Sequence, residues 1–328
     1  MTETYYTVAD RGFFPGAVAL LNSLRLTGNT GEIVVLDAGL TADQRARLEP
    51  HARVERPPRD AVEHPTLLKP FVHELHRDGV AVLIDSDVVV TSSLDSLLAQ
   101  ADEGKICACW DHPDAIHRIF PEWVELFGLR TALQPRTYVN AGFVAIGGAL
   151  AAPLLHRWWE ATERLIGRQW VPDADDPAWD FDQDTLNALL MSEFAEVELV
   201  DLPHEMALPP DLYRTRLVDG GTLETMLDGR RVQLLHYTGG PKPWHRHGWS
   251  RSRRDAYTAL LPRLLFGSDV ALRVDPGEVP LWLRPSAPGA AALAALSVVN
   301  RSIRALGSRA PHAMEARLRL LRSRLAKG

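Results

Sequence analysis

The chain has 328 residues, of which 46% are hydrophobic and 24% charged, with a formal net charge of −6. This balance is typical of a globular protein that buries a core without disulfides or structural metals. It argues against a membrane-spanning protein, because no run of about twenty apolar residues occurs. We also expect no secretory leader, because the N-terminus lacks a basic region and an apolar core.

Strands and helices alternate in the first part of the sequence. Residues 80–84 (VAVLI) form a continuous apolar run, as expected of a strand covered on both faces. Such alternation predicts an α/β fold, a mixed but mostly parallel sheet flanked by helices. Strands are predicted at 4–9, 32–37 and 80–84, and helices at 15–26, from the N-cap Thr41 onward, and at 66–77.

The second part of the sequence is more mixed. Residues 239–254 are rich in Gly, Pro, Trp and basic residues, and indicate a loop near an anionic ligand. Cys107 and Cys109 lie two residues apart on one face of a predicted strand, where they cannot easily bridge each other. Reduced thiols are therefore expected rather than a disulfide. Strands are predicted at 105–110, 139–147, 197–200 and 231–236, helices at 153–166 and 180–194, and an acidic loop at 170–179.

The C-terminal end differs from the rest in charge. Residues 289–328 carry seven Arg and one Lys against Glu315, a net of +7 that leaves −13 for the body. We expect one domain over 1–275, a Pro-rich linker over 276–288, and a basic amphipathic helical tail over 289–328. Such a tail can lie on an anionic membrane surface. The alternative is that it forms a helix pair packed on the body or on a second subunit. The acidic body argues against nucleic acid.

An acid pair follows the apolar strand at 80–84. Asp85 and Asp87 lie at its carboxyl end, where open α/β sheets bind ligands. Two adjacent carboxylates repel each other unless a cation neutralises them, and Mg²⁺ or Mn²⁺ takes oxygen ligands and bridges phosphates. The pair therefore predicts a site for a metal and a diphosphate. The alternative is a turn with two solvated acids.

Two further segments carry chemistry. His236 follows a predicted strand and precedes Gly239, Gly240 and Lys242. A histidine ring nitrogen can ligate Mn²⁺, glycine amides can approach an anion closely, and a lysine supplies charge for phosphate. The segment 180–184 places three acids and Gln183 at a helix start, which is dense for simple capping.

In this order, the segments resemble the family 8 retaining glycosyltransferases, the group of glycogenin and the bacterial lipopolysaccharide galactosyltransferases. The resemblance covers residues 4 to about 250 and implies a single-domain GT-A fold. The matching residues are Asp10 with the aromatic Phe13, Asp85-Ser-Asp87, Asn140-Ala-Gly142, Asp182-Gln183-Asp184 with Asn187, and His236, Gly239, Lys242-Pro-Trp244.

The resemblance implies a UDP-sugar donor and Mn²⁺ (or Mg²⁺) held by Asp85, Asp87 and His236. Asp10 and Phe13 would contact uracil and ribose, and Lys242 and Gly239 the diphosphate. Asn140 and Asp182 would bind the transferred sugar, with Gln183 under the anomeric carbon, so Asp182 and Gln183 are the expected catalytic residues. The full set of expected donor contacts is Asp10, Phe13, Lys69, Asp85, Ser86, Asp111, Asn140, Ala141, Gly239 and Lys242.

Two departures from the family pattern stand out. Gly12-Phe13 replaces the usual Asn-Tyr or Ala-Tyr, and phenylalanine stacks but does not hydrogen-bond. The segment 173–177 is an insertion.

Because Gln183 is a poor nucleophile, we expect same-face attack with the leaving phosphate assisting deprotonation of the acceptor.

The expected enzyme is a hexosyltransferase that moves glucose or galactose from a UDP-sugar to a glycan or glycolipid acceptor. It would be cytoplasmic, with the tail on the inner face of the membrane if that hypothesis holds. Two other classes stay open. One is a haloacid-dehalogenase-like phosphatase with Asp85 as nucleophile, although that motif normally opens its fold. The other is a non-catalytic nucleotide-sugar-binding protein.

Overall fold

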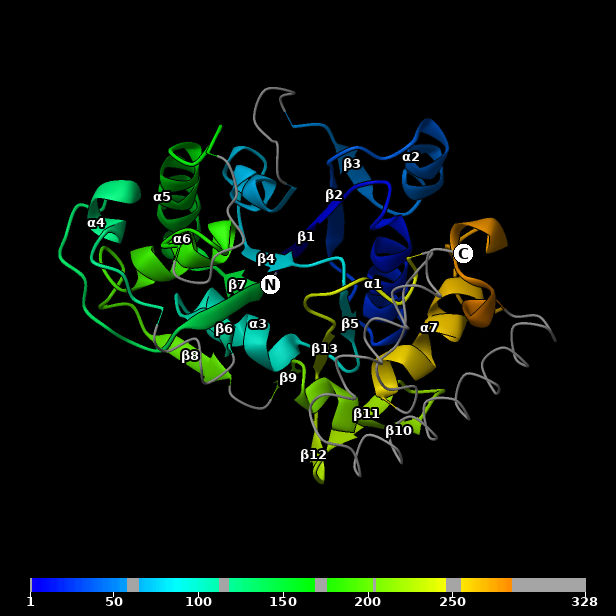
Figure 1. The fold of residues 1–328 in the computed structure, drawn as a ribbon. Helices are drawn as coiled ribbons and strands as arrows, with labels where there is room; N and C mark the ends of the chain where they lie inside the picture. Colours follow the sequence, from blue (N-terminus) through cyan, green and yellow to red (C-terminus); the bar gives the residue numbers. More distant parts are fainter. Residues whose placement is uncertain are drawn as a thin grey trace, which may run out of the picture.

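The centre of the computed structural model is a seven-stranded sheet in the order β3-β2-β1-β4-β7-β6-β8 (Figure 1). Adjacent strands are parallel except where β7 lies antiparallel between β4 and β6, which confirms the expected mixed, mostly parallel sheet. The structure describes residues 2–57, 65–111, 118–168, 176–202, 205–245 and 255–284. The strands are β1 (Glu3–Ala9), β2 (Glu32–Asp37), β3 (Arg53–Glu55), β4 (Val80–Ile84), β6 (Ile106–Trp110), β7 (Val139–Ile146) and β8 (Leu199–Leu202).

Helices cover both faces of this sheet, and two small sheets complete the fold. One has the order β5-β13-β9 and the other β10-β11-β12. Their strands are β5 (Val88–Val90), β9 (Met206–Ala207), β10 (Arg216–Asp219), β11 (Glu224–Leu227), β12 (Arg230–Arg231) and β13 (Leu234–His236). The α-helices are α1 (Phe14–Leu26), α2 (Ala42–Leu48), α3 (Asp95–Asp102), α4 (Trp123–Leu126), α5 (Ala151–Glu163), α6 (Phe181–Leu190) and α7 (Ala256–Phe266). The 3-10 helices are η2 (Pro65–Glu74), η4 (Gly148–Leu150), η5 (Asp211–Arg214), η6 (Pro276–Glu278) and η7 (Leu281–Leu283).

The strand β4 shows why its sequence is apolar throughout. Val82 and Ile84 pack into the core formed with α1 and α7, whereas Ala81 and Leu83 pack into the core formed with α5 and α6. Successive side chains of a strand point to opposite faces, so a strand between two helical layers must be apolar at every position. Figure 1 shows these two helical layers on opposite sides of the sheet.

The predicted helix over 66–77 is wrong in type. The segment is a 3-10 helix, η2, with Pro70 inside it. Proline lacks the backbone N–H that an α-helix interior needs, and its ring clashes with the preceding turn. The consequence is functional, because the irregular turn holds Lys69 buried against the end of β4.

Several boundaries also differ from expectation. The helix predicted over 180–194 ends at Leu190, and the strand predicted over 197–200 lies at 199–202. The short helix after Thr41 is confirmed, with a capping box in which Gln44 reciprocates the Thr41 bond. Both cysteines are buried thiols, as expected.

The C-terminal part of the described chain packs onto the domain. Helix α7 is capped by Asp255, whose side chain accepts the N–H of Thr258. Within 276–284, part of the expected linker, Val279, Trp282 and Leu283 are buried in the α1–α7 core. The expected tail at 289–328 lies outside the described residues. Within the described ranges, no helix combines the length and apolarity needed to cross a bilayer.

Candidate active site

Backbone hydrogen bonds place the acid pair beside His236. At the end of β4, the N–H of Asp85 donates to the carbonyl of Gly142 on β7 at 2.9 Å. The chain then turns into β5, which pairs antiparallel with β13 so that Val88 opposes His236. The N–H of Tyr237 donates to the carbonyl of Asp87 at 3.1 Å. Residues about 150 positions apart in sequence are thus fixed by one short ladder.

The three side chains form one cluster, as the metal hypothesis requires. Single ligand atoms from Asp85, Asp87 and His236 all lie within 4.8 Å of one another. The Nε2 atom of His236 is 3.2 Å from Oδ1 of Asp87 and 3.6 Å from Oδ2 of Asp85. Two carboxylates and an imidazole form a donor set that suits a divalent cation such as Mn²⁺.

The orientation of the imidazole can be worked out from its neighbours. The Oδ1 atom of Asn140 accepts the backbone N–H of Gly142 at 2.9 Å, so this atom is an oxygen and can only accept. The Nδ1 atom of His236 lies 3.1 Å from the same oxygen and therefore carries a proton. The Nε2 atom then faces two carboxylates, an arrangement that a bound cation stabilises. The residues present thus fit a divalent metal.

Two buried lysines flank the cluster. The Nζ atom of Lys242 lies 2.5 Å from Oδ2 of Asp87, and that of Lys69 lies 2.7 Å from both Oδ1 of Asp85 and Oδ2 of Asp182. Burial disfavours the charge of Lys69, but the two carboxylates outweigh it and hold its pKa above the usual range. Lys69 therefore couples the metal cluster to the acid at the start of α6.

The two acids of the pair respond differently to their surroundings. Burial raises the pKa of Asp85, against the opposing charge of Lys69. Burial also acts on Asp87, but Lys242 and His236 overcome it and hold the pKa of Asp87 well below its usual range. Asp87 is therefore the firmly ionised member of the pair.

A second group of predicted residues lies where α6 meets β6 and β7. The N–H of Ala141 donates to Oε1 of Gln183 at 2.9 Å, and Nε2 of Gln183 donates to Oδ2 of Asp111 at 2.6 Å. The carbonyl of Asp182 accepts the indole N–H of Trp158 at 3.1 Å. The backbone of β7 thus orients Gln183, while Asp182 joins it to the metal cluster through Lys69.

The structure explains why 180–184 holds so many acids. Asp184 is fully buried and accepts bonds from Arg118 at 2.6 Å and from the hydroxyl of Tyr138 at 2.7 Å. It is a structural acid, and burial raises its pKa against the opposing hydrogen bonds. Burial, together with Asp184 and Asp182, raises the pKa of Asp180 to about 7.

Sequence reasoning missed the roles of Tyr138 and Arg118. The hydroxyl of Tyr138 lies 3.4 Å from Nε2 of Gln183, so Tyr138 supports an expected catalytic side chain, whereas Arg118 pairs with the structural acid Asp184. Tyr138 directly precedes the strand that carries Asn140, which is a usable signal. Arg118 offers no signal, because its partner Asp184 lies 66 positions further along the chain.

The residues expected to contact the base lie near Lys242 and Trp244. The Oδ1 atom of Asp10 accepts the N–H groups of Gly12 and Phe13 at 2.7 and 2.9 Å, which shapes the turn into α1. The Nζ atom of Lys242 lies 5.7 Å from the centre of the Phe13 ring. Trp244, which is buried, donates its indole N–H to the carbonyl of Gly12 at 2.9 Å. The β1–α1 turn and the 239–245 segment therefore form one wall.

Glycine is needed at specific points of this wall. Gly239 and Gly240 have φ of +64° and +54°, the left-handed region in which glycine is favoured. A Cβ atom on Gly16 would lie 2.4 Å from the carbonyl oxygen of Ser86 and 2.6 Å from the Trp244 ring. Helix α1 thus approaches the buried Ser86 as closely as a backbone can.

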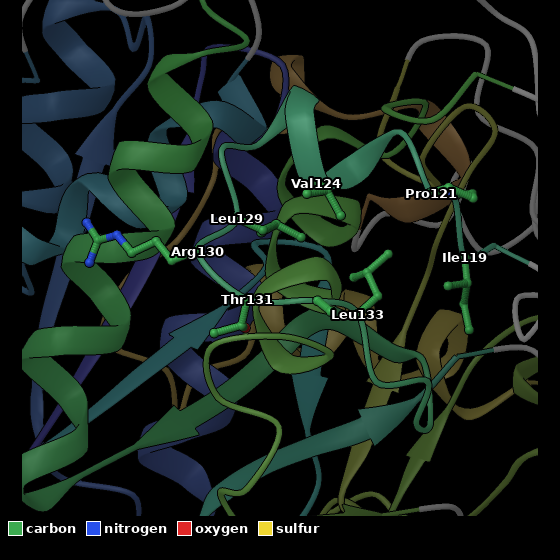
Figure 2. Close-up of a pocket in the computed structure, with 8 residues that line it drawn as sticks. Ile119, Pro121, Val124, Leu129, Arg130, Thr131 and Leu133 are labelled. Carbon is green, nitrogen blue, oxygen red and sulfur yellow. The ribbon is translucent and has the colours of Figure 1, made fainter.

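A separate hollow of about 600 Å³ lies beside α4. Figure 2 shows Val124, Leu129 and Leu133 directed into it, whereas Arg130 points away, toward its partner Glu160 on α5. None of the predicted site residues lines this hollow. The candidate site is therefore the cluster around Asp85 and not this apolar surface.

Comparison with known proteins gives a likeness in structure alone. No protein-family model matches the chain. A search of curated proteins also gives no match. Among solved structures, the bifunctional glycosyltransferase WbbM superposes with a TM-score of 0.52 at 17% identity over 82% of this chain and 50% of WbbM. The galactosyltransferase LgtC, in complex with donor and acceptor sugar analogs, gives 0.51 at 18% identity over 84% of this chain and all of LgtC.

An active-site variant of LgtC gives a TM-score of 0.50 at 18% identity over 84% of this chain and 98% of that one. The chain thus spans half the length of WbbM and the whole length of LgtC. These likenesses define the class of fold: it is the GT-A type found in glycosyltransferases, as expected from the sequence.

Proposed function

We propose that this chain is a retaining glycosyltransferase that moves a hexose, glucose or galactose, from a UDP-sugar to a glycan or glycolipid acceptor. The observation that carries the proposal is the cluster of Asp85, Asp87 and His236, with Lys242 at one side and Lys69 at the other. Acids that converge on one point between two cations suit a metal-diphosphate group better than a solvated turn.

The structural neighbours support the same chemistry. WbbM is described as a bifunctional glycosyltransferase, and LgtC as a galactosyltransferase solved with donor and acceptor sugar analogs. A further LgtC structure carries an active-site change of glutamine to glutamate. In this chain Gln183 directly follows Asp182, the acid that pairs with Lys69.

The metal site is assigned to Asp85, Asp87 and His236, with Mn²⁺ or Mg²⁺ as the ion. When bound, such an ion supplies positive charge to the diphosphate as it leaves. The Asn140 side chain fixes the His236 ring with Nε2 toward the acids. Lys242, with Gly239 beside it, adds a point charge on the diphosphate side.

The protein residues then divide the remaining work. Asp10 and Phe13 bind the base and ribose, and Ser86 and Ala141 complete the donor contacts. Asn140 and Asp182 hold the transferred hexose, and Gln183, oriented by Ala141 and Asp111, lies under its anomeric carbon.

The reaction breaks the bond between the anomeric carbon and the diphosphate oxygen. A bond to the acceptor oxygen forms on the same face, and the acceptor proton passes to the leaving phosphate oxygen, so UDP is released. Gln183 makes no covalent bond in this scheme, because an amide is a poor nucleophile. Trapping of a glycosyl adduct on Asp182 would replace same-face attack with a double displacement.

The basic tail at 289–328 is proposed to hold this cytoplasmic enzyme on the inner, anionic face of a membrane. Flotation with anionic liposomes tests it on the full chain and on a truncation ending at Pro288. Flotation of the full chain alone is expected, and equal partitioning of both proteins contradicts it.

The function itself is tested by hydrolysis of nucleotide-sugars, which needs no acceptor. We expect slow, Mn²⁺-dependent release of UDP from UDP-glucose or UDP-galactose, lost in Asp87→Ala and retained in Asp43→Ala, which removes an exposed acid on α2. Turnover of simple phosphate esters without UDP-sugar hydrolysis would instead identify a phosphatase. Binding of UDP-sugar with no turnover in any condition would identify a binding protein.

A further inference from the structure

Trp110, at the carboxyl end of β6, is unusual among the tryptophans of the described ranges. It is 44% exposed, whereas Trp123, Trp158 and Trp244 are at most 1% exposed. An indole ring left in water forgoes the stabilisation that its burial would give. A single exposed apolar residue needs no explanation by itself, so its position in the site carries the argument.

That position is the edge of the proposed sugar-binding site. The residue before Trp110, Cys109, pairs with Asn140 across the β6–β7 ladder. The residue after it, Asp111, accepts the bond from Gln183 and donates its N–H to the carbonyl of Tyr138 at 3.3 Å. The backbone of Trp110 is thus held on both sides by residues that contact the groups assigned to the transferred hexose.

The chemistry of the ring suggests what it binds. The donor side of the site is already furnished by Asp10, Phe13 and Lys242, which lie on the β1–α1 turn and the 239–245 segment. Trp110 comes from β6, which β4 and β7 separate from β1 in the sheet order. A pyranose presents an apolar face of C–H groups, which an exposed indole can cover while hydroxyls at the ring edge reach polar neighbours.

Resting on the proposed function, we propose that Trp110 is the stacking platform for the sugar ring of the acceptor and so helps select a carbohydrate acceptor over water. The ring contacts the acceptor and takes no part in bond making. Its removal is expected to weaken acceptor binding and leave donor chemistry intact.

The test separates donor turnover from transfer. Hydrolysis of UDP-glucose and UDP-galactose with Mn²⁺ is measured first, and transfer to a panel of methyl and p-nitrophenyl glycosides second, in native protein, Trp110→Ala and Trp110→Phe. Val218→Ala, at a β10 position that is 59% exposed, is the matched control. We expect Trp110→Ala to raise the acceptor KM by about ten-fold, Trp110→Phe to keep most of the affinity, and hydrolysis to stay within about two-fold.

An unchanged acceptor KM in Trp110→Ala would overturn the inference, as would an equal loss of hydrolysis and transfer. It is also overturned if the native protein hydrolyses the donor and no glycoside in the panel alters that turnover. In each of these cases the proposed function stands. Absence of UDP-sugar hydrolysis in the native protein would count against the proposed function itself.

Discussion

Replacing Gly142 with alanine offers a direct test of the proposed metal site. A Cβ atom on Gly142 would lie 2.2 Å from Cε1 and 2.5 Å from Nδ1 of His236, and 2.7 Å from Oδ1 of Asn140. Ordinary contacts of this kind begin at 3.4 Å, so the imidazole must retreat by about 1.2 Å. The methyl group would also separate the two atoms of the hydrogen bond that orients the ring.

The expected loss is larger in metal affinity than in stability. His236 is buried in β13 and has little room to move, so overpacking should cost about 1–3 kcal/mol in the free energy of unfolding. Displacing the ring and breaking its orienting hydrogen bond should weaken Mn²⁺ binding by about 10–100-fold, the range seen when groups behind a metal ligand are changed.

Mn²⁺ affinity is measured by calorimetric titration, and thermal unfolding is measured in parallel. Gly277→Ala is the matched control, because a Cβ atom there meets nothing within 4 Å and the backbone φ is ordinary. Native Mn²⁺ affinity in a folded Gly142→Ala protein would refute the argument that His236 holds the metal through Nε2.

Three further predictions concern the groups around this centre. Because burial and neighbouring acids raise the pKa of Asp180 to about 7, its ionisation costs the folded state stability progressively as pH rises from about 4 through about 7. Asp180→Asn should therefore raise Tm increasingly over that window and not at all below it, and a gain independent of pH would contradict this. Lys69→Met leaves the buried carboxylate of Asp182 and the partly buried carboxylate of Asp85 without their shared cation, which should cost about 3 kcal/mol in chemical denaturation. Added Mn²⁺ should recover part of that loss. The control Lys105→Met, which breaks a more exposed ion pair, should cost little. A Lys69→Met protein as stable as the native one would disprove the coupling. Trp244→Phe removes the indole bond to the carbonyl of Gly12, so the donor KM should rise while Mn²⁺ affinity stays native, and a changed kcat at unchanged donor KM would show that Trp244 does not position the donor wall.

Local patterns in the sequence predicted the elements that local physics determines. The run at 80–84 predicted β4 because a strand between two helical layers needs apolar residues on both faces. The acid pair after it, and His236 after a second strand, were predicted as a metal cluster, and the structure brings them together. Thr41 predicted a helix start because its side chain is a favourable N-cap, and the structure adds a capping box with Gln44 three residues later.

What the sequence did not predict depends on contacts between distant residues. The expected α-helix at 66–77 became a 3-10 helix at Pro70, and that turn buries Lys69 between two acids from different elements. The density of acids at 180–184 mixes functions, because Asp184 serves Arg118 and Tyr138 rather than a ligand. Neither pairing follows any periodicity along the chain.

The position of His236 on β13 has a mechanical consequence. Asp85 and Asp87 follow the main sheet, whereas His236 belongs to the small three-stranded sheet β5-β13-β9. An ion shared by these three residues would act as a cross-link that closes a loop of about 150 residues, a constraint whose entropic effect grows with loop length. Binding of the ion would then restrain the two sheets relative to each other. Removal of the ion by a chelator would leave the short β5–β13 ladder to resist separation of the two sheets.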